Sequence, residues 1–417
     1  MSGVLVDKDF LEMIDCGNFT KFEVDLKSYV QPASLDLPLS SKCYLVKDKI
    51  LPFGQDIESL LPSIVLSEAS SLLLKDQTYL CYCGHINLPS TIYAKCSPKS
   101  SIGRIDLFVR TIFDQSGFYD QIEKGASGNL WIQICPRSFN VQIYPGLALT
   151  QMALFDTSVK SEEKQQIVHL NTQLGGYQAK ATNQVLDLSK LDHDSSLYFD
   201  PILPNIEFVL EKDKFYILAT IEKININPME SAEMVPFTSS IGEFRCHKAG
   251  FFDPGFNAVG VLEICPYETI KVFNGQPIAL LNYFQNKSLP LVLYGDANNN
   301  YQHQTGPQLA KYFAKPKKRS RAQIEFQDET MFVLHKFELL QKEITKLIKN
   351  IEWIDENESN FCLGIYLCDI KANGLEFYKE TKQICEEIQA KGHCTNYEMY
   401  FSILQKMLYF REKKESK

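Results

Sequence analysis

The chain has 417 residues, of which 45% are hydrophobic and 23% are charged, and its formal net charge is −8. This length suggests two or three domains, and the composition is typical of a folded globular protein rather than a disordered one. The negative balance gives no general attraction to nucleic acid or to an anionic membrane, so we expect neither as a partner.

The N-terminus and the cysteines indicate the compartment. No apolar run approaches the roughly 18 residues that a membrane span needs. Residues 1–10 carry Asp7, Lys8 and Asp9 where a secretory signal would have its apolar stretch, so we expect a cytoplasmic protein. The 12 cysteines include no Cys-x-x-Cys pair, which predicts reduced, mostly buried thiols rather than disulfides or zinc ligands.

An internal repeat organises the first three-quarters of the chain. Residues 74–108 and 211–247 both run from Lys-Asp through an aromatic strand and Ile-Asn to a Ser-Ser-Ile-Gly turn. Short alternating segments separated by Gly, Pro and Asn follow each turn, which indicates strands. The sequence therefore predicts a mainly β protein with two tandem barrel or jelly-roll domains, residues 1–195 and 196–314.

The last hundred residues, 315–417, differ in character. They begin with a basic segment, 315–321, that is either a solvated hinge or a nucleic-acid contact. Apolar residues then recur at heptad spacing from Val333 to Ile351, which predicts an α-helical extension. Its apolar seam either packs within a small three-helix unit or mediates self-association.

Five short motifs carry a family resemblance. They are QPASLDL (31–37), PKSSIGR (98–104), AGFFDPGF (249–256), VLEI (261–264) and YQHQTGP (301–307). In order and spacing they resemble the tandem, two-domain form of the dCTP deaminases, within the dUTPase superfamily, over about residues 3–313. The resemblance implies two dUTPase-like domains and a hydrolase acting on cyclic amidines. This enzyme would convert dCTP to dUTP and ammonia, feed thymidylate nucleotide synthesis, and take Mg²⁺ with the triphosphate.

The route of deamination follows from which residues are present. Zinc deaminases use a His-x-Glu and a Pro-Cys-x-x-Cys signature to hold a zinc-bound hydroxide. None of the seven histidines is followed by x-Glu, and no Cys-x-x-Cys exists, so we expect no zinc and no metal site in the protein itself. The resemblance implies instead a carboxylate that acts as general base and then as acid.

The resemblance assigns that carboxylate to Glu263. Burial in the apolar strand 259–264 would raise its pKa toward the working range, although strand position alone equally allows an outward-pointing side chain. The carbonyl of Ala249 would hold the water, and Asp253 would bind the deoxyribose hydroxyl. Pro254 and Gly255 are explained by turn formation.

The turn at 98–104 has the composition of a phosphate cradle. Lys99, Ser100, Ser101 and Arg104 offer hydroxyls, amides and two cations to polyphosphate oxygens; the alternative is a β-turn with a surface ion pair. The resemblance gives both Ser100 and Arg104 catalytic roles, with Ser100 helping to position the water and Arg104 contacting the pyrimidine.

A second element of the resemblance lies at residues 300–304. Tyr301 and Gln304 resemble a C-terminal lid that closes over the nucleotide. The family usually has a basic residue just before that tyrosine, where this chain has Asn300.

The two copies of the repeat are degenerate in opposite ways. The first has the cradle but Gln133 where the base would lie, and the second has Glu263 but Glu243 in place of the cradle arginine. Family active sites form between two barrels. We therefore predict one composite site within the chain, in which the first cradle meets Glu263, and an inactive reciprocal site.

Two other functions remain as alternatives. One is a dUTPase or a bifunctional deaminase and diphosphatase. The family's dUTPase motif has a tyrosine after its aspartate, whereas Asp253 is followed by Pro254, which favours deamination. The other alternative is a catalytically silent nucleotide sensor in which Gln133 and Asn300 mark lost activity.

Overall fold

The computed structural model describes residues 2–61, 65–67, 70–160, 164–237, 244–246, 250–296 and 300–314. Contacts divide the chain into two units, Met1–Lys315 and Pro316–Lys417, of which the first is described here. Most described residues in elements are in strands, which confirms the mainly β prediction. The predicted basic segment and helical extension at 315–417 lie outside the described residues.

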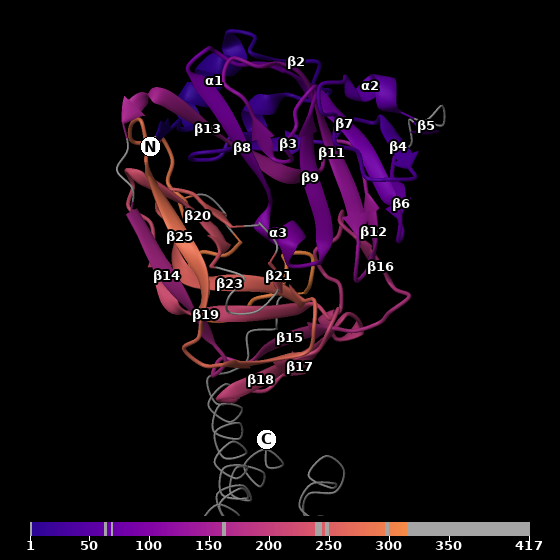
Figure 1. Ribbon diagram of the computed structural model, residues 1–417, viewed down its shortest axis with the longest axis vertical. Coiled ribbons are helices and arrows are strands. Elements are labelled where there is room, and N and C mark those ends of the chain that lie inside the picture. Colours follow the sequence, from indigo (N-terminus) through magenta and orange to yellow (C-terminus); the bar gives the residue numbers. More distant parts are fainter. Residues whose placement is uncertain are drawn as a thin grey trace, which may run out of the picture. The chain divides into compact units, whose positions relative to one another are not determined.

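The first half, residues 2–160, contains three short helices and one 3-10 turn among its strands; the three helices are labelled in Figure 1. These are α1 (Asp7–Asp15), α2 (Ile57–Leu60), α3 (Ser100–Gly103) and η1 (Leu26–Tyr29). Its strands are β1 (Ser2–Val4), β2 (Phe19–Thr20), β3 (Leu35–Pro38), β4 (Cys43–Val46), β5 (Val65–Ser67), β6 (Leu72–Leu74), β7 (Thr78–Asn87), β8 (Ile92–Pro98), β9 (Leu107–Phe113), β10 (Gln121–Ile122), β11 (Ser127–Pro136), β12 (Asn140–Ile143) and β13 (Ala148–Lys160).

The second half, residues 164–314, adds a single 3-10 turn, η2 (Ser195–Leu197), among its strands. These strands are β14 (Lys164–Asn171), β15 (Gly176–Ala179), β16 (Val185–Asp187), β17 (Phe199–Ile202), β18 (Glu207–Leu210), β19 (Tyr216–Asn225), β20 (Glu230–Pro236), β21 (Phe244–Cys246), β22 (Phe251–Phe252), β23 (Asn257–Pro266), β24 (Ile270–Phe273) and β25 (Pro277–Gln285).

The described strands form five sheets that repeat one pairing scheme. In the first half a five-stranded sheet contains β8, β10 and β13, a six-stranded sheet contains β7, β9 and β11, and β12 pairs with β6. The second half repeats these pairs as β20 with β22 and β25, β23 with β19 and β21, and β18 with β24. The repeat predicted from the sequence is thus confirmed by strand pairing.

The strands around residue 195 belong to sheets of both halves. β14 and β15 pair with β19 in the nine-stranded sheet, whereas β16 pairs in parallel with β12 of the first half. Residues near the end of the described chain also return to the first half, because Ala310, Tyr312 and Phe313 are buried in its main core. The domain boundary at residue 195 stays a prediction.

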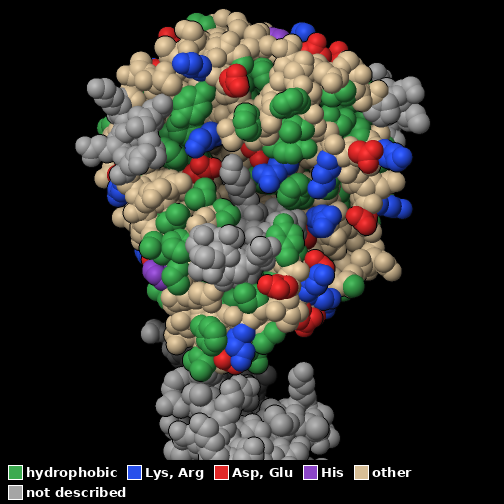
Figure 2. Space-filling model, viewed as in Figure 1, with side chains coloured by type: hydrophobic (Ala, Val, Ile, Leu, Met, Phe, Trp, Pro, Cys, Tyr) green, Lys and Arg blue, Asp and Glu red, His purple; other side chains and the backbone are tan. Residues whose placement is uncertain are grey.

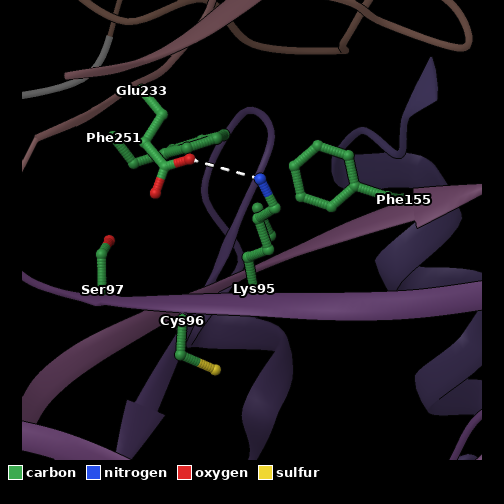
Figure 3. Close-up of a pocket in the computed structure, with 7 residues that line it drawn as sticks. Lys95, Cys96, Ser97, Phe155, Glu233 and Phe251 are labelled. Atoms are coloured by element: carbon green, nitrogen blue, oxygen red, sulfur yellow. Dashed lines mark hydrogen bonds and ion pairs between the residues drawn. The ribbon is translucent and has the colours of Figure 1, made fainter. Parts of the chain in front are cut away.

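A seam of equivalent residues joins the two halves (Figure 3). Lys95 of β8 and Glu233 of β20 each lie three residues before the proline that ends their strand, and their Nζ and Oε2 atoms are 3.5 Å apart. The Lys95 ammonium lies 5.3 Å from the ring centres of both Phe155 and Phe284, which pack edge to face. At this seam the halves therefore meet through apolar rings and an ion pair.

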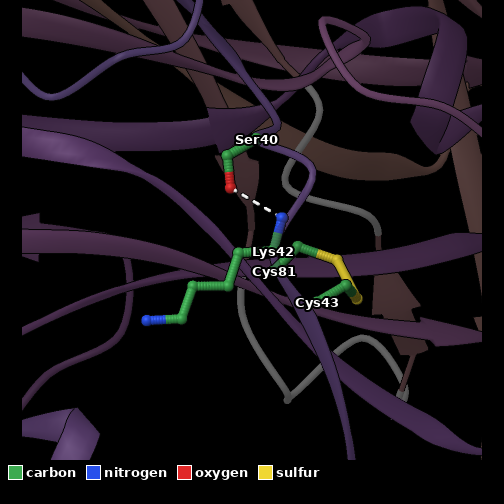
Figure 4. Close-up of a disulfide and its surroundings, with 4 residues drawn as sticks. All are labelled: Ser40, Lys42, Cys43 and Cys81. Carbon is green, nitrogen blue, oxygen red and sulfur yellow. Dashed lines mark hydrogen bonds between the residues drawn. A yellow bond between two sulfur atoms is a disulfide. The ribbon is translucent and has the colours of Figure 1, made fainter. Parts of the chain in front are cut away.

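One prediction about the cysteines is wrong. Cys43 of β4 and Cys81 of β7 form a disulfide, although the sequence indicated reduced thiols (Figure 4). The two residues are directly opposite each other in the antiparallel register, with Cα atoms 4.1 Å apart, so their side chains meet on one face. Cys83, Cys96 and Cys135 are buried and lie outside the disulfide, as expected.

The surface shows mixed charge. On the described part of the face in Figure 2, acidic and basic side chains are interspersed. Within the described ranges, no helix has both the length and the apolar character that a membrane crossing requires.

Candidate active site

The 98–104 turn is fixed at the end of β8, where the first half faces β23 (Figure 1). The Lys99 N–H donates to the Leu149 carbonyl at 3.0 Å and holds the turn on β13. Ile102 is fully buried in the first core and anchors α3. Since the turn is pinned from both sides, Ser101 and Arg104 are held in buried positions.

Glu263 of β23 comes from the second half and meets this turn. Its side chain is 5% exposed, and its Oε1 lies 3.9 Å from Nε of Arg104. Burial raises the pKa of Glu263 to about 8, against the opposing effect of the Arg104 charge. The structure thus brings the predicted base and the cradle arginine together within one chain, as expected for a composite site.

Asp253 of the second half occupies another buried position, which faces the 31–37 motif. One of its carboxylate oxygens accepts the Ala33 N–H at 3.0 Å, from the 31–37 motif of the first half. Burial raises the pKa of Asp253 to about 7, and the Ala33 hydrogen bond partly offsets this rise. Asp36 of the same motif forms an ion pair with Lys99 and is 4% exposed.

The 300–314 segment lies across the cradle. The hydroxyls of Tyr301 and Ser101 are 2.8 Å apart, and the Arg104 guanidinium carbon is 3.8 Å from the centre of the Tyr301 ring. Arg104 also donates to Oε1 of Gln304 at 3.1 Å and to the Gln308 carbonyl at 2.8 Å. Gln304 in turn donates to the Val259 carbonyl of β23 at 2.7 Å, so this segment connects both halves of the site.

Two buried polar atoms at this site have no hydrogen-bond partner among the described residues. They are Oδ1 of Asp36 and Nε of Arg104. Buried polar groups are nearly always satisfied, and unpaired ones at a single site indicate capacity reserved for water or a ligand.

The sequence interpretation missed several residues that the structure places here. Asp36 lies within the 31–37 motif, and an acidic residue in the apolar run Ser-Leu-Asp-Leu is a signal of a buried carboxylate that needs an ion-pair partner. Gln308 contributes only its carbonyl, for which a sequence carries no signal. Tyr294 approaches Asp253 closely enough for that carboxylate to raise its pKa further, after burial.

Two predicted residues cannot be placed. Ala249, the expected water-holding carbonyl, and Glu243 of the second cradle lie outside the described residues. Ser100 is in α3 beside Ser101, within the same turn.

Gln133, the first-half counterpart of Glu263, has a structural hydrogen bond. Gln133 and Glu263 occupy the same register, because Gln133 lies opposite Leu80 on β7 and Glu263 lies opposite Ile217 on β19. Gln133 accepts the Ile50 N–H at 2.7 Å through Oε1 and is almost fully buried. Its side-chain oxygen therefore serves the loop before α2.

Comparison with known proteins identifies the family. Residues 1–158 match the model of the 2'-deoxycytidine 5'-triphosphate deaminase (DCD) N-terminal domain, and residues 154–313 match that of its C-terminal domain. A "dCTP deaminase, dUMP-forming" from Corynebacterium glutamicum (strain R) is 30% identical over 144 residues, 31% of this chain and 76% of that protein. The chain belongs to the dCTP deaminase family.

Further dCTP deaminases support this assignment. A protein of the same printed name from Methanosphaera stadtmanae is 28% identical over 169 residues, 39% of this chain and 82% of that protein. The crystal structure of 2'-deoxycytidine 5'-triphosphate deaminase from Agrobacterium tumefaciens is 29% identical, with a TM-score of 0.63. The match covers 69% of this chain and 99% of the Agrobacterium tumefaciens chain, so the two proteins share both halves of the repeat.

Within the described ranges there is no group of three or more His, Cys, Asp or Glu residues that could hold a metal ion. A zinc-independent reaction stays a prediction.

Proposed function

We propose that the chain deaminates dCTP by hydrolysis, with Glu263 as the base that activates water. The observation that carries this proposal is the 3.9 Å approach of Glu263 to Arg104, both buried, from opposite halves of the repeat. Membership of the dCTP deaminase family supports it independently.

In this mechanism Glu263 removes a proton from water, and the resulting hydroxide attacks the amino-bearing carbon of the cytosine ring. Glu263 then returns the proton to the departing amine, so that dCTP and water give dUTP and ammonia. Its pKa of about 8 suits both roles, because a group that must accept and donate works best with a pKa near the operating pH. Ser100 and the carbonyl of Ala249 would position the water.

The remaining site residues would bind the nucleotide. Lys99 and Ser101 would contact the phosphates, Asp253 the sugar hydroxyl, and Tyr301 and Gln304 would close over the nucleotide. Mg²⁺ would arrive with the triphosphate.

A bifunctional enzyme that carries dCTP on to dUMP is the second candidate. The two relatives named above bear the words "dUMP-forming" in their names, which favours this candidate. The Asp253-Pro254 sequence favours simple deamination instead. In either case we propose a zinc-free enzyme of the cytoplasm that acts on neither nucleic acid nor membrane. Residues 315–417 would serve self-association.

One assay separates these functions. Purified protein is incubated with dCTP and Mg²⁺, and the products are resolved by anion-exchange chromatography, with Glu263→Gln as the matched inactive control. Formation of dUTP supports deamination alone, and dUMP supports the bifunctional enzyme. Unchanged dCTP with the wild-type protein would refute the proposal and favour the nucleotide sensor.

A further inference from the structure

Lys311 is held at the edge of the cradle by the backbone of the lid segment. Its N–H donates to the Tyr301 hydroxyl at 3.2 Å, and that hydroxyl lies 2.8 Å from Oγ of Ser101. The neighbouring residues Ala310 and Tyr312 are buried in the first core. The backbone at Lys311 is therefore fixed two hydrogen bonds from the cradle serine.

The Lys311 side chain belongs to a cluster of two cations and one carboxylate. It is half-buried, and its pKa is lowered by burial and then by the charge of Lys99. The Lys311 charge also acts on Asp36, whose carboxylate is paired with Lys99. The Nζ atom of Lys311 lies 5.5 Å from the centre of the buried Tyr312 ring. The charges of Lys311 and Lys99 thus both act on one buried acid, which leaves an excess of positive charge beside the cradle turn.

The cations assigned to the cradle leave a deficit for a triphosphate. A nucleoside triphosphate carries about four negative charges, and charge-assisted contacts from Lys and Arg are the usual way to bind them. Arg104 already donates to Gln304 and to the Gln308 carbonyl. Asn300, at the position where the resemblance predicts a basic residue, is uncharged and exposed.

We propose that Lys311 contacts the outer phosphates of the bound nucleotide and supplies the positive charge that Asn300 does not. Lys311 then determines the preference for a triphosphate over a monophosphate, because only the longer tail reaches it. This inference rests on the proposed function, since it takes the same site to bind dCTP. It adds a residue that lies 10 positions beyond Tyr301 in the chain and returns to the cradle through the fold.

Binding without turnover gives the test. In the Glu263→Gln protein, the dissociation constants of dCTP and dCMP are measured with Mg²⁺ by isothermal titration calorimetry. Adding Lys311→Met should weaken dCTP binding about tenfold or more and change dCMP binding less than about twofold, as expected for one lost charge-assisted contact. Lys311→Arg keeps the charge and should stay within about threefold of the parent. Lys212→Met, at an exposed lysine, is the matched control and should change neither constant.

The outcomes separate this inference from the proposed function. Equal weakening of dCTP and dCMP, no weakening of either, or a loss with Lys311→Arg as large as with Lys311→Met would overturn the role of Lys311. These results leave deamination by the wild-type protein untouched, because that activity is measured separately. Absence of dCTP binding by the parent together with absence of wild-type turnover would overturn both proposals.

Discussion

Replacing the base should make the protein more stable while it abolishes activity. Glu263→Gln keeps the shape of the side chain but removes the ionisable group, so turnover should fall by about a hundred- to ten-thousand-fold or more. The stability effect follows from burial. The pKa of Glu263 is about 8 in the folded chain and 4.5 for an ordinary glutamate. Between these values the folded state keeps a proton that the unfolded state releases.

The sign and size of the effect follow from this difference. Stability of the wild type falls as pH rises from 4.5 to 8, because ionisation favours the unfolded chain throughout that window. At 1.36 kcal/mol per pKa unit, the loss is about 3 kcal/mol at pH 7 and about 5 kcal/mol above pH 8. The glutamine variant escapes this loss, so its free energy of unfolding should exceed that of the wild type by an amount that grows with pH.

Urea unfolding of both proteins at pH 5.5, 7 and 8.5 measures this difference. Glu268→Gln removes a glutamate that is exposed, and it should show no comparable dependence on pH. In parallel, wild-type kcat/KM should rise with pH up to about 8, because the base must be ionised in the free enzyme. An advantage of Glu263→Gln that stays constant from pH 5.5 to 8.5 would refute the argument that burial raises this pKa.

Four other outcomes are expected. Arg104→Ala should lose turnover as severely as Glu263→Gln, and a mixture of the two variants should stay inactive because one chain forms the site; recovery of up to about a quarter would show exchange between chains. Lys95→Glu should place two carboxylates at the seam and lower the free energy of unfolding, measured by thermal unfolding, by about 2 kcal/mol. Adding Glu233→Lys should recover most of that loss, and a double variant as unstable as Lys95→Glu would show that the ion pair does not stabilise the seam. Gln133→Glu should not restore turnover to Glu263→Gln, and restored dCTP turnover would reveal a second site. A zinc-selective chelator should leave turnover unchanged, whereas a loss reversed by added zinc would contradict the zinc-free route.

The sequence predicted the repeat and the pairing of unlike halves because both depend on local patterns. The Ser-Ser-Ile-Gly turns and the apolar strand around Glu263 are contiguous segments whose roles can be recognised without knowing what packs on them. The position of the cradle turn was also predictable, since a proline closes the strand before it.

The residues that were missed depend on contacts between distant segments. The Cys43–Cys81 disulfide follows from strand register, which composition does not reveal. Asp36 and Lys311 reach the site only because the 31–37 motif and the lid segment converge on Lys99. The parallel pairing of β16 with β12 of the first half likewise follows from a crossover that has no local sequence pattern.

The division of the site between the two copies has a consequence for the gene. In a protein built from identical copies, either copy can be lost or exchanged for the other, since each encodes every functional group. Here Gln133 occupies the register of Glu263, and the cradle arginine of the site comes from the other copy. Neither copy can replace its partner, so gene conversion that made the copies identical would erase the base or the cradle. Under the proposed mechanism, the two halves can therefore function only as one unit.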